Sequence, residues 1–291
     1  MGVKQGLANR SADALIYLVL AAFLVVTLVP FLHIAAMSFS SNGPILSGHV
    51  TIIPIDFNLE AYKVVMTDSQ VMQSLLFTIE LTVVYTLFSL IMTICCAYPL
   101  TKSYLRGYKF IMLMIVVTMF FSGGIIPEYM LVKQLNLLNT MWVMIVPGLI
   151  SPFYMIIMRS FFKNIPDGIE ESAQIDGCSH IGILLRIVLP LSLPVIATLS
   201  LFYAVHRWNG FMDSLLFITD TDLYPMQLRL YNIIMNASGA FTEQEGMTDA
   251  QILPESIKSA NIVFATVPIL LAYPWLQKYF VSGMTLGSVK G

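Results

Sequence analysis

Long apolar runs are the feature that most limits how this chain can fold. The first run covers residues 14–37, ALIYLVLAAFLVVTLVPFLHIAAM, and contains no formally charged side chain. A bilayer core of about 30 Å is crossed by a helix of roughly 20 apolar residues, so this run is long enough to span a membrane. The sequence therefore predicts an all-α, polytopic membrane protein made of a single transmembrane domain. Its six transmembrane helices are expected near residues 14–37, 76–100, 108–127, 141–158, 190–208 and 261–280.

The composition agrees with a membrane protein. Charged residues make up only 11% of the chain, whereas an ordinary soluble domain contains about 25%. Lys4 and Arg10 precede the first run, as they would in a signal peptide, but its apolar part exceeds the roughly 7–15 residues of such a peptide. We therefore expect a retained helix. Cys95, Cys96 and Cys178 lack the spacing of a disulfide or metal site, and we expect no metal ligands.

Lysine and arginine are distributed unequally between the two sides of the predicted membrane. With six spans, the N-terminus, the second and fourth connections and the C-terminus share one side, which holds ten of the 15 Lys and Arg residues. Positive charge in short loops favours the cytoplasmic side. We therefore expect both termini in the cytoplasm, with residues 1–13 as a cytoplasmic tail, residues 159–189 as a cytoplasmic loop and residues 209–260 as an extracytoplasmic loop.

The cytoplasmic loop is rich in acidic residues for so apolar a chain. Its centre, NIPDGIEESAQIDG, has a helix-start pattern in which Asp167 caps the first N–H groups and Glu170 reaches back, as in a capping box. Gly177 suits the left-handed residue that follows a helix, and Ser179 can cap a second short helix. Pro190 suits the first turn of the next span. The sequence therefore predicts a helix–glycine–helix element along the membrane surface.

An amphipathic linker that rests on lipid head groups is the alternative for this loop. An anionic inner leaflet would repel the two acidic residues at its start. A helix that binds lipid usually carries Lys and Arg on its polar face. We therefore favour an interaction between this loop and a cytoplasmic protein.

Small, acidic and proline residues recur in the loop at defined spacings. The residues are Glu171, Ala173, Asp176, Gly177, Ile187, Leu189, Pro190 and Pro194, with Ser172 between the first two. This spacing resembles the EAA loop of ABC-importer permeases, in which Ser172 replaces the first alanine. The stretches RWNGFMDSLLFITD, YPMQLRL and KYFVSGMTLGSVKG resemble the MalG-like branch of carbohydrate permeases, and the subset for complex or oligomeric sugars is the most similar. The resemblance covers roughly residues 70–291.

The resemblance implies the type I ABC-importer permease fold in the bacterial cytoplasmic membrane. Closure of two ATP-binding subunits would rock the helices between inward-facing and outward-facing states. The other implied partners are a second homologous permease, an extracytoplasmic solute-binding protein and a sugar substrate, with no nucleic acid. The implied ATPase-docking residues are Glu170, Glu171, Ser172, Ala173, Asp176, Gly177, Leu189, Pro190 and Pro194.

The sequence contains no G-x-x-x-x-G-K-[ST] motif, which is the usual cradle for the phosphates of ATP. We therefore expect no catalytic residues and no bound cofactor in this chain. ATP and Mg²⁺ would be held by the partner ATPase subunits.

Polar residues in and near the apolar runs are candidates for the substrate pathway. A carboxylate inside a span suggests a function by default, although a structural hydrogen bond to a neighbouring helix is an equal alternative for Glu80. Sugar sites use aromatic faces and polar groups, which makes Tyr85, Trp208, Asn209 and Asp213 the other candidates. A place in the aromatic belt at the membrane interface is the alternative for the two aromatic residues. The outer loop would reach toward the binding protein, or would be a solvated loop without a partner.

Other functions also fit a polytopic membrane protein. A membrane metalloprotease would need H-E-x-x-H, which the sequence lacks. A secondary transporter works without ATP and often has internal repeats and broken helices, but no convincing repeat occurs here and the acidic loop would be unexplained. A permease for a non-sugar solute is a further alternative. The stretch FFSGGIIPEYM forms either a hinge or a tight outer turn.

Overall fold

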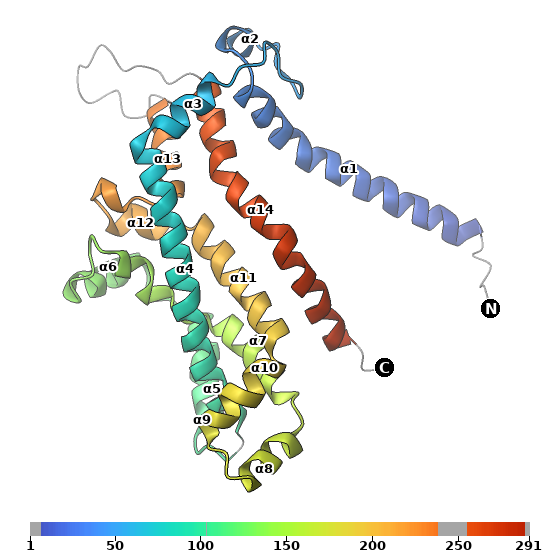
Figure 1. Ribbon diagram of the computed structural model, residues 1–291, viewed down its shortest axis with the longest axis vertical. Helices are drawn as coiled ribbons and strands as arrows, with labels where there is room; N and C mark the ends of the chain where they lie inside the picture. Colours follow the sequence, from blue (N-terminus) through green and yellow to red (C-terminus); the bar gives the residue numbers. More distant parts are fainter. Residues whose placement is uncertain (1–6, 103, 238–254, 289–291) are drawn as a thin grey trace. The chain divides into compact units, whose positions relative to one another are not determined.

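The computed structural model describes the backbone of residues 7–102, 104–237 and 255–288, and the side chains of residues 13–102, 104–235 and 255–271. Throughout these residues the regular structure is helical, without a strand (Figure 1). The all-α fold predicted from the apolar runs is therefore confirmed. Half of the predicted cytoplasmic tail, part of the predicted outer loop and the side chains of KYFVSGMTLGSVKG lie outside the described residues.

The chain divides into two compact units. Met1–Met72 and Leu230–Val267 form unit 1, and Gln73–Arg229 and Pro268–Gly291 form unit 2. Three helices contribute residues to both units, namely α4 (Ser69–Ala97), α13 (Met226–Ala237) and α14 (Glu255–Ser288).

Unit 1 begins with α1 (Leu7–Ser38), most of whose apolar side chains are exposed. A helix that is apolar on all sides is typical of a membrane span. The short helices α2 (Asn42–Leu46) and α3 (Glu60–Thr67) follow. Phe39 stacks on Tyr62 with ring centroids 4.9 Å apart, and the hydroxyl oxygens of Ser38 and Tyr62 are 2.8 Å apart. These contacts fix α3 against the end of α1.

Unit 2 contains the other described elements. In chain order they are η1 (Pro99–Thr101), α5 (Tyr108–Thr118), α6 (Ile125–Gln134), η2 (Met141–Met144), η3 (Val146–Gly148), α7 (Pro152–Lys163), α8 (Asp167–Ile175), α9 (His180–Ile183), the π-helical turn η4 (Leu184–Val188), α10 (Leu189–Leu191), α11 (Leu193–Asn209), α12 (Met212–Phe217) and η5 (Thr221–Leu223).

Helices α4, α7 and α11 share the core of unit 2. One cluster of buried side chains surrounds Met158, and a second surrounds Leu81. Tyr203 is fully buried in the second cluster. Its hydroxyl oxygen lies 2.7 Å from Thr93 Oγ1 and accepts a hydrogen bond from the Ser151 N–H at 3.2 Å. This hydroxyl joins α11 to α4 and to the residue that precedes α7.

The spans predicted at 14–37 and 76–100 each fall in one long helix. Among the described residues, two helices are long and apolar enough to cross a membrane, Asp13–Ser38 and Ser69–Thr101. Two bent helix pairs each add a span if the pair is counted as one crossing. The limits of the six spans stay a prediction.

The helix predicted at 108–127 is wrong as a continuous element. Helix α5 ends at Thr118 and α6 begins only at Ile125. Gly124 between them has a φ of +86°, a conformation in which glycine avoids the steric penalty of a Cβ atom. The FFSGG sequence therefore forms a break between two helices.

The helices predicted at 141–158 and 190–208 are also interrupted. The first consists of two 3₁₀ turns and α7, with a bend of 53°, and the second bends by 81° between Leu191 and Leu193. A proline lies in the first turn after each break, Pro152 in α7 and Pro194 in α11. Proline lacks an N–H and its ring clashes with the preceding turn, so it favours the first turn of a helix, although α1 continues through Pro30. Apolar character alone did not reveal these breaks.

The ends of the last two predicted segments also differ from the structure. The span predicted at 261–280 lies inside the longer helix α14. The predicted outer loop at 209–260 contains α12, η5 and α13, so it is a partly helical segment.

Candidate functional site

The predicted helix–glycine–helix element is present at one end of unit 2, where Figure 1 shows α8 and α9 side by side. We call residues 167–183 the elbow. Gly177 has a φ of +80° directly after α8. The Cys178 N–H donates to the Ala173 carbonyl at 2.9 Å and the Gly177 N–H to the Gln174 carbonyl at 3.0 Å. These two bonds are those of a Schellman motif, which satisfies the last carbonyls of a helix.

The start of the second helix also agrees with the sequence. Ser179 Oγ accepts a hydrogen bond from the Gly182 N–H at 3.2 Å and so caps α9. The predicted positions of Gly177 and Ser179 are therefore confirmed.

The capping box predicted at the start of α8 is wrong. Pro166 occupies the N-cap position and Asp167 is the first helical residue, with no side-chain cap hydrogen bond. A capping box needs an N–H on the N-cap residue, and proline has none. Glu170 instead forms an ion pair with Lys102, which follows η1.

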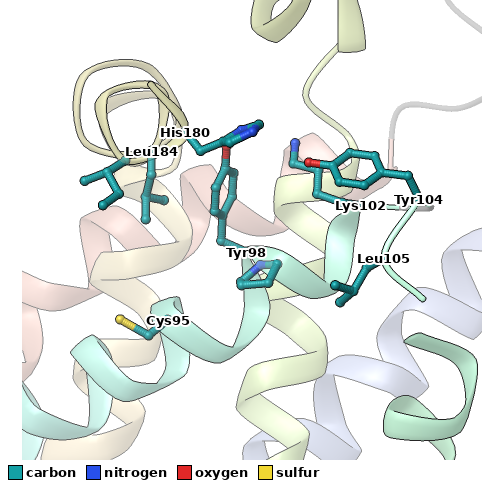
Figure 2. Close-up of a pocket in the computed structure, with 9 residues that line it drawn as sticks. Cys95, Tyr98, Lys102, Tyr104, Leu105, His180 and Leu184 are labelled. Carbon is teal, nitrogen blue, oxygen red and sulfur yellow. The ribbon is translucent and has the colours of Figure 1, made fainter. Parts of the chain in front are cut away.

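The Glu170–Lys102 ion pair is largely shielded from water. The two side chains are 12% and 17% exposed. Lys102 Nζ lies 4.8 Å from the centroid of the Tyr98 ring, and the Tyr98 hydroxyl donates to Glu170 at 3.4 Å. Figure 2 shows Tyr98 between Lys102 and His180, above the end of α4. Glu170 is therefore bound within its own chain.

The other predicted docking residues occupy two different environments. Glu171, Ser172, Asp176 and Gly177 are exposed on the elbow, whereas Ala173 is half-buried against the core. The remaining predicted docking residues lie near the bend between α10 and α11 and do not belong to the elbow. There Leu189 packs on the core, Pro190 is exposed and Pro194 is half-buried.

Sequence reasoning missed two exposed apolar side chains of the elbow. Ile175 is 86% exposed and Ile181 is 71% exposed. Ile175 lies between Ala173 and Asp176, and Ile181 follows Gly177 by four residues. Their position in a helix–turn–helix next to charged residues is the signal that could have revealed them. The exposed face of the elbow therefore combines apolar and acidic groups.

A cavity of about 420 Å³ lies elsewhere in unit 2, where α4, η3 and α11 meet. Tyr85, Asn209 and Asp213 line it, which brings three of the predicted pathway residues together. The other two predicted residues do not line it. Glu80 is exposed on α4, and Trp208 is buried.

Arg207, which the sequence analysis did not single out, is the central charged group of this cavity. It is 5% exposed, and its two Nη atoms donate to both carboxylate oxygens of Asp213. The same atoms donate to the carbonyls of Met144 at 2.9 Å and Gly210 at 3.2 Å. A cation inside an apolar run is the signal that could have identified it. Asp213 is therefore committed to an internal ion pair.

Tyr85 also satisfies a backbone group at this cavity. Its hydroxyl donates to the Gly148 carbonyl at 2.9 Å, and its ring lies 5.9 Å from Arg207 Cζ. Tyr85 and Arg207 therefore bind the carbonyls of η3 and η2, the irregular segment that precedes α7. Of the predicted pathway residues that line the cavity, Asn209 has an exposed side chain, although its amide donates to the Val205 carbonyl.

The elbow and the cavity both lie in a part of the chain that matches a known protein family. The family described as "Binding-protein-dependent transport system inner membrane component" matches residues 82–286, which include the elbow and the cavity. The chain belongs to this family.

Relatives of this permease match it over nearly the whole chain. The polygalacturonan/rhamnogalacturonan transport system permease protein YtcP of Bacillus subtilis is 43% identical over 97% of this chain and 99% of its own length. Protein LplC of the same organism is 43% identical over 98% of this chain and 96% of its own length.

A solved structure also matches the permease. It is the crystal structure of a bacterial ABC transporter involved in the import of the acidic polysaccharide alginate. The matched chain is 29% identical, is covered completely, covers 96% of this permease and gives a TM-score of 0.87. The type I ABC-importer permease fold is therefore confirmed.

Substitution of Gly177, the residue directly after α8, will test the turn of the elbow in this permease. A Cβ atom at Gly177 meets no atom within 4 Å, so only the backbone conformation opposes Gly177→Ala. We expect a loss of about 1–2 kcal/mol of stability, because a left-handed conformation is unfavourable for alanine. The measurement is thermal unfolding of the purified complex in detergent.

Gly168→Ala is the matched control for this substitution. Gly168 lies in α8, and a Cβ atom there also meets open space. We expect unchanged or slightly higher stability, because alanine is the better helix residue. Equal destabilisation by both substitutions contradicts the assigned turn.

Removal of Asp213 will test the Arg207 ion pair. Asp213→Ala leaves the buried Arg207 guanidinium without its counter-ion, which costs about 3–5 kcal/mol for a largely buried pair. Glu128→Ala is the control, because Glu128 lines the same cavity with an exposed side chain. We expect a lower thermal unfolding midpoint for Asp213→Ala and little change for Glu128→Ala. Similar midpoints for the two variants contradict a structural role for the pair.

Proposed function

We propose that this chain is the membrane-spanning permease subunit of an ATP-driven importer of acidic oligosaccharides. An extracytoplasmic binding protein delivers the sugar, and separate ATPase subunits drive alternating access. The observation that carries the proposal is the 43% identity, over nearly full length, with the polygalacturonan/rhamnogalacturonan permease YtcP.

The acidic sugar class is supported by two independent comparisons. Polygalacturonan is a polymer of uronic acid, and the solved transporter with a TM-score of 0.87 is involved in the import of the acidic polysaccharide alginate. A neutral oligosaccharide is the second candidate, because the arabinooligosaccharide permease AraQ of Halalkalibacterium halodurans is 23% identical over 91% of this chain. The higher identity favours the acidic class.

Two observations indicate the partners of this chain: its sequence has no phosphate-binding loop motif, and the elbow exposes acidic and apolar side chains. No phosphate-binding loop motif occurs in the sequence, so ATP and Mg²⁺ are assigned to two partner ATPase subunits and no cofactor to this chain. The proposed docking surface consists of the exposed acids Glu171 and Asp176 and the exposed Ile175, which follows Glu171 by about one helical turn. A second, homologous permease completes the pathway.

The orientation in the membrane is part of the proposal. The family is an inner membrane component, and ten of the 15 Lys and Arg residues lie on the side that contains both predicted termini and the elbow. Because positive charge in short loops stays cytoplasmic, we assign both termini and the elbow to the cytoplasm.

The cavity beside α11 is the proposed contribution of this chain to the sugar pathway. The Tyr85 ring and the Asn209 side chain supply an aromatic face and a polar group, and the Arg207–Asp213 pair shapes the wall. Glu80 and Trp208 do not line the cavity and are left out of the assignment.

Co-purification and transport will test the proposal. The tagged chain is isolated from its native host, and we expect a second permease and an ATPase subunit to accompany it. In proteoliposomes that contain the complex, oligogalacturonate uptake will require both ATP and the binding protein. Glu171→Lys will release the ATPase subunit, because a reversed charge at a docking contact is repelled.

Asp222→Lys is the control for this charge reversal. Asp222 is exposed in the predicted outer connection, so its reversal will leave the ATPase subunit bound. Uptake without ATP contradicts the importer assignment and favours a secondary transporter. Uptake of neutral but not acidic oligosaccharides contradicts only the sugar class.

A further inference from the structure

Glu170 and Glu171 are neighbours in sequence with opposite environments. Both line the cavity beside Lys102, but Glu171 is exposed, whereas the Glu170 side chain is 12% exposed and paired with Lys102. Consecutive residues of an α-helix point about 100° apart, so α8 directs one carboxylate outward and the other toward the end of α4. The two acids therefore cannot have the same role.

Helix α8 makes little packing contact of its own. None of its residues is fully buried, and Ala173 is its half-buried contact with the core cluster. Thr101, Lys102 and α8 line a cavity of about 350 Å³, and the end of α4 and α9 line another of about 330 Å³. Lys102 lines both cavities. With open space on both sides, the Glu170–Lys102 pair and the Ala173 contact hold α8 near the end of α4.

The surroundings of this ion pair make it stronger than a typical surface pair. Exposed pairs contribute little because water screens them, but both partners here are more than four-fifths shielded. The Tyr98 ring lies beneath the ammonium group and the Tyr98 hydroxyl donates to the carboxylate. A cation over an aromatic face is further stabilised when it is removed from water. The pair therefore fixes two elements of the chain to each other.

Helix α4 runs from the cavity beside α11 to Ala97, and Tyr98 and the short turn η1 join it to Lys102. It covers Ser69–Ala97, and Tyr98 follows it directly. Tyr85 lies on the same helix and contacts the Gly148 carbonyl and the Arg207 guanidinium. With a rise of about 1.5 Å per residue, Tyr85 and Tyr98 are separated by roughly 20 Å along the axis. A displacement of α8 would therefore reach the cavity through η1 and helix α4.

We propose that the Glu170–Lys102 ion pair, supported by Tyr98, is the strut that transmits movement of the elbow to α4. Glu170 is then a positioning residue inside the permease, while Glu171 contacts the ATPase. The inference rests on the proposed ATP-driven function. It replaces the expectation that both acids dock to the ATPase.

The test measures coupling rather than assembly. The complex of permeases, ATPase subunits and binding protein is reconstituted in proteoliposomes, and sugar transported per ATP hydrolysed is determined. Glu170→Gln and Lys102→Gln will retain the ATPase subunit but transport about tenfold less sugar per ATP, a size typical of coupled neighbouring charges. The exchanged pair Lys102→Glu with Glu170→Lys will recover most of the transport per ATP.

Two further variants keep the result interpretable. Tyr98→Phe removes only the hydroxyl that donates to Glu170, so a smaller loss of transport per ATP is expected than for Glu170→Gln. Glu171→Lys will instead lose the ATPase subunit itself. The exchanged pair also controls for misfolding, because a merely damaged loop would not be repaired by a second charge reversal.

Three outcomes would contradict the proposed role of the Glu170–Lys102 ion pair. Glu170→Gln could release the ATPase subunit as Glu171→Lys does, which would place Glu170 in the docking contact. Transport per ATP could be unchanged in both single variants, or the exchanged pair could be as defective as the single variants. Failure of the wild-type complex to contain an ATPase contradicts the proposed function itself and is recognised before any variant is compared.

Discussion

The backbone between α6 and α7 is irregular, so its carbonyl and N–H groups need hydrogen-bond partners in the centre of unit 2. Residues 141–151 form two short 3₁₀ turns and a break instead of a continuous helix. Unpaired carbonyl and N–H groups are costly away from water, and inside a membrane they must be satisfied by protein. Arg207 binds the Met144 carbonyl, Tyr85 binds the Gly148 carbonyl and Tyr203 accepts from the Ser151 N–H. Three side chains from α4 and α11 thus stabilise the break.

Two of the side chains that bind these backbone groups also line the cavity beside α11. Tyr85 and Arg207 line the cavity and also stabilise the break, so the cavity cannot change shape without affecting α4 and α11. Asp213 neutralises the buried guanidinium. The same helix α4 ends beside the elbow, where Tyr98 and Lys102 contact Glu170. Helix α4, together with Tyr98 and the turn η1 that follow it, therefore links the proposed docking element to the proposed sugar pathway, which is the physical basis for coupling between them.

The sequence predicted those features that depend on neighbouring residues. The turn at Gly177 and the cap at Ser179 follow from local backbone preferences, and both are confirmed. The long helix α4 follows from an apolar run without proline. The runs at 141–158 and 190–208 were misjudged as continuous helices, because apolar character measures affinity for lipid and not the hydrogen bonds that proline removes.

Contacts between distant residues could not be read from the sequence. Glu170 was assigned to a capping box, yet its partner Lys102 lies 68 residues away and becomes available only when α4 and α8 meet. For Arg207 the distant partner is the Met144 carbonyl, 63 residues away, whereas Gly210 and Asp213 lie only three and six residues along the chain. The position of Glu170 and Glu171 in a short helix could be predicted, but the burial of one side chain and the exposure of the other required the folded chain.

A cysteine cross-link from the elbow tests the central claim most directly, that this exposed surface binds an ATPase. Ile175 is 86% exposed at the end of α8, so Ile175→Cys is placed in a chain whose Cys95, Cys96 and Cys178 are replaced by serine. A reagent that joins a thiol at one end and reacts with any neighbouring residue on illumination at the other is applied to the intact complex in native membranes, with Asp222→Cys as the control. The account predicts a product that joins the permease to an ATP-binding subunit from Ile175→Cys and not from Asp222→Cys. An elbow that forms no such product, while the ATPase is present in the same membranes, would contradict it.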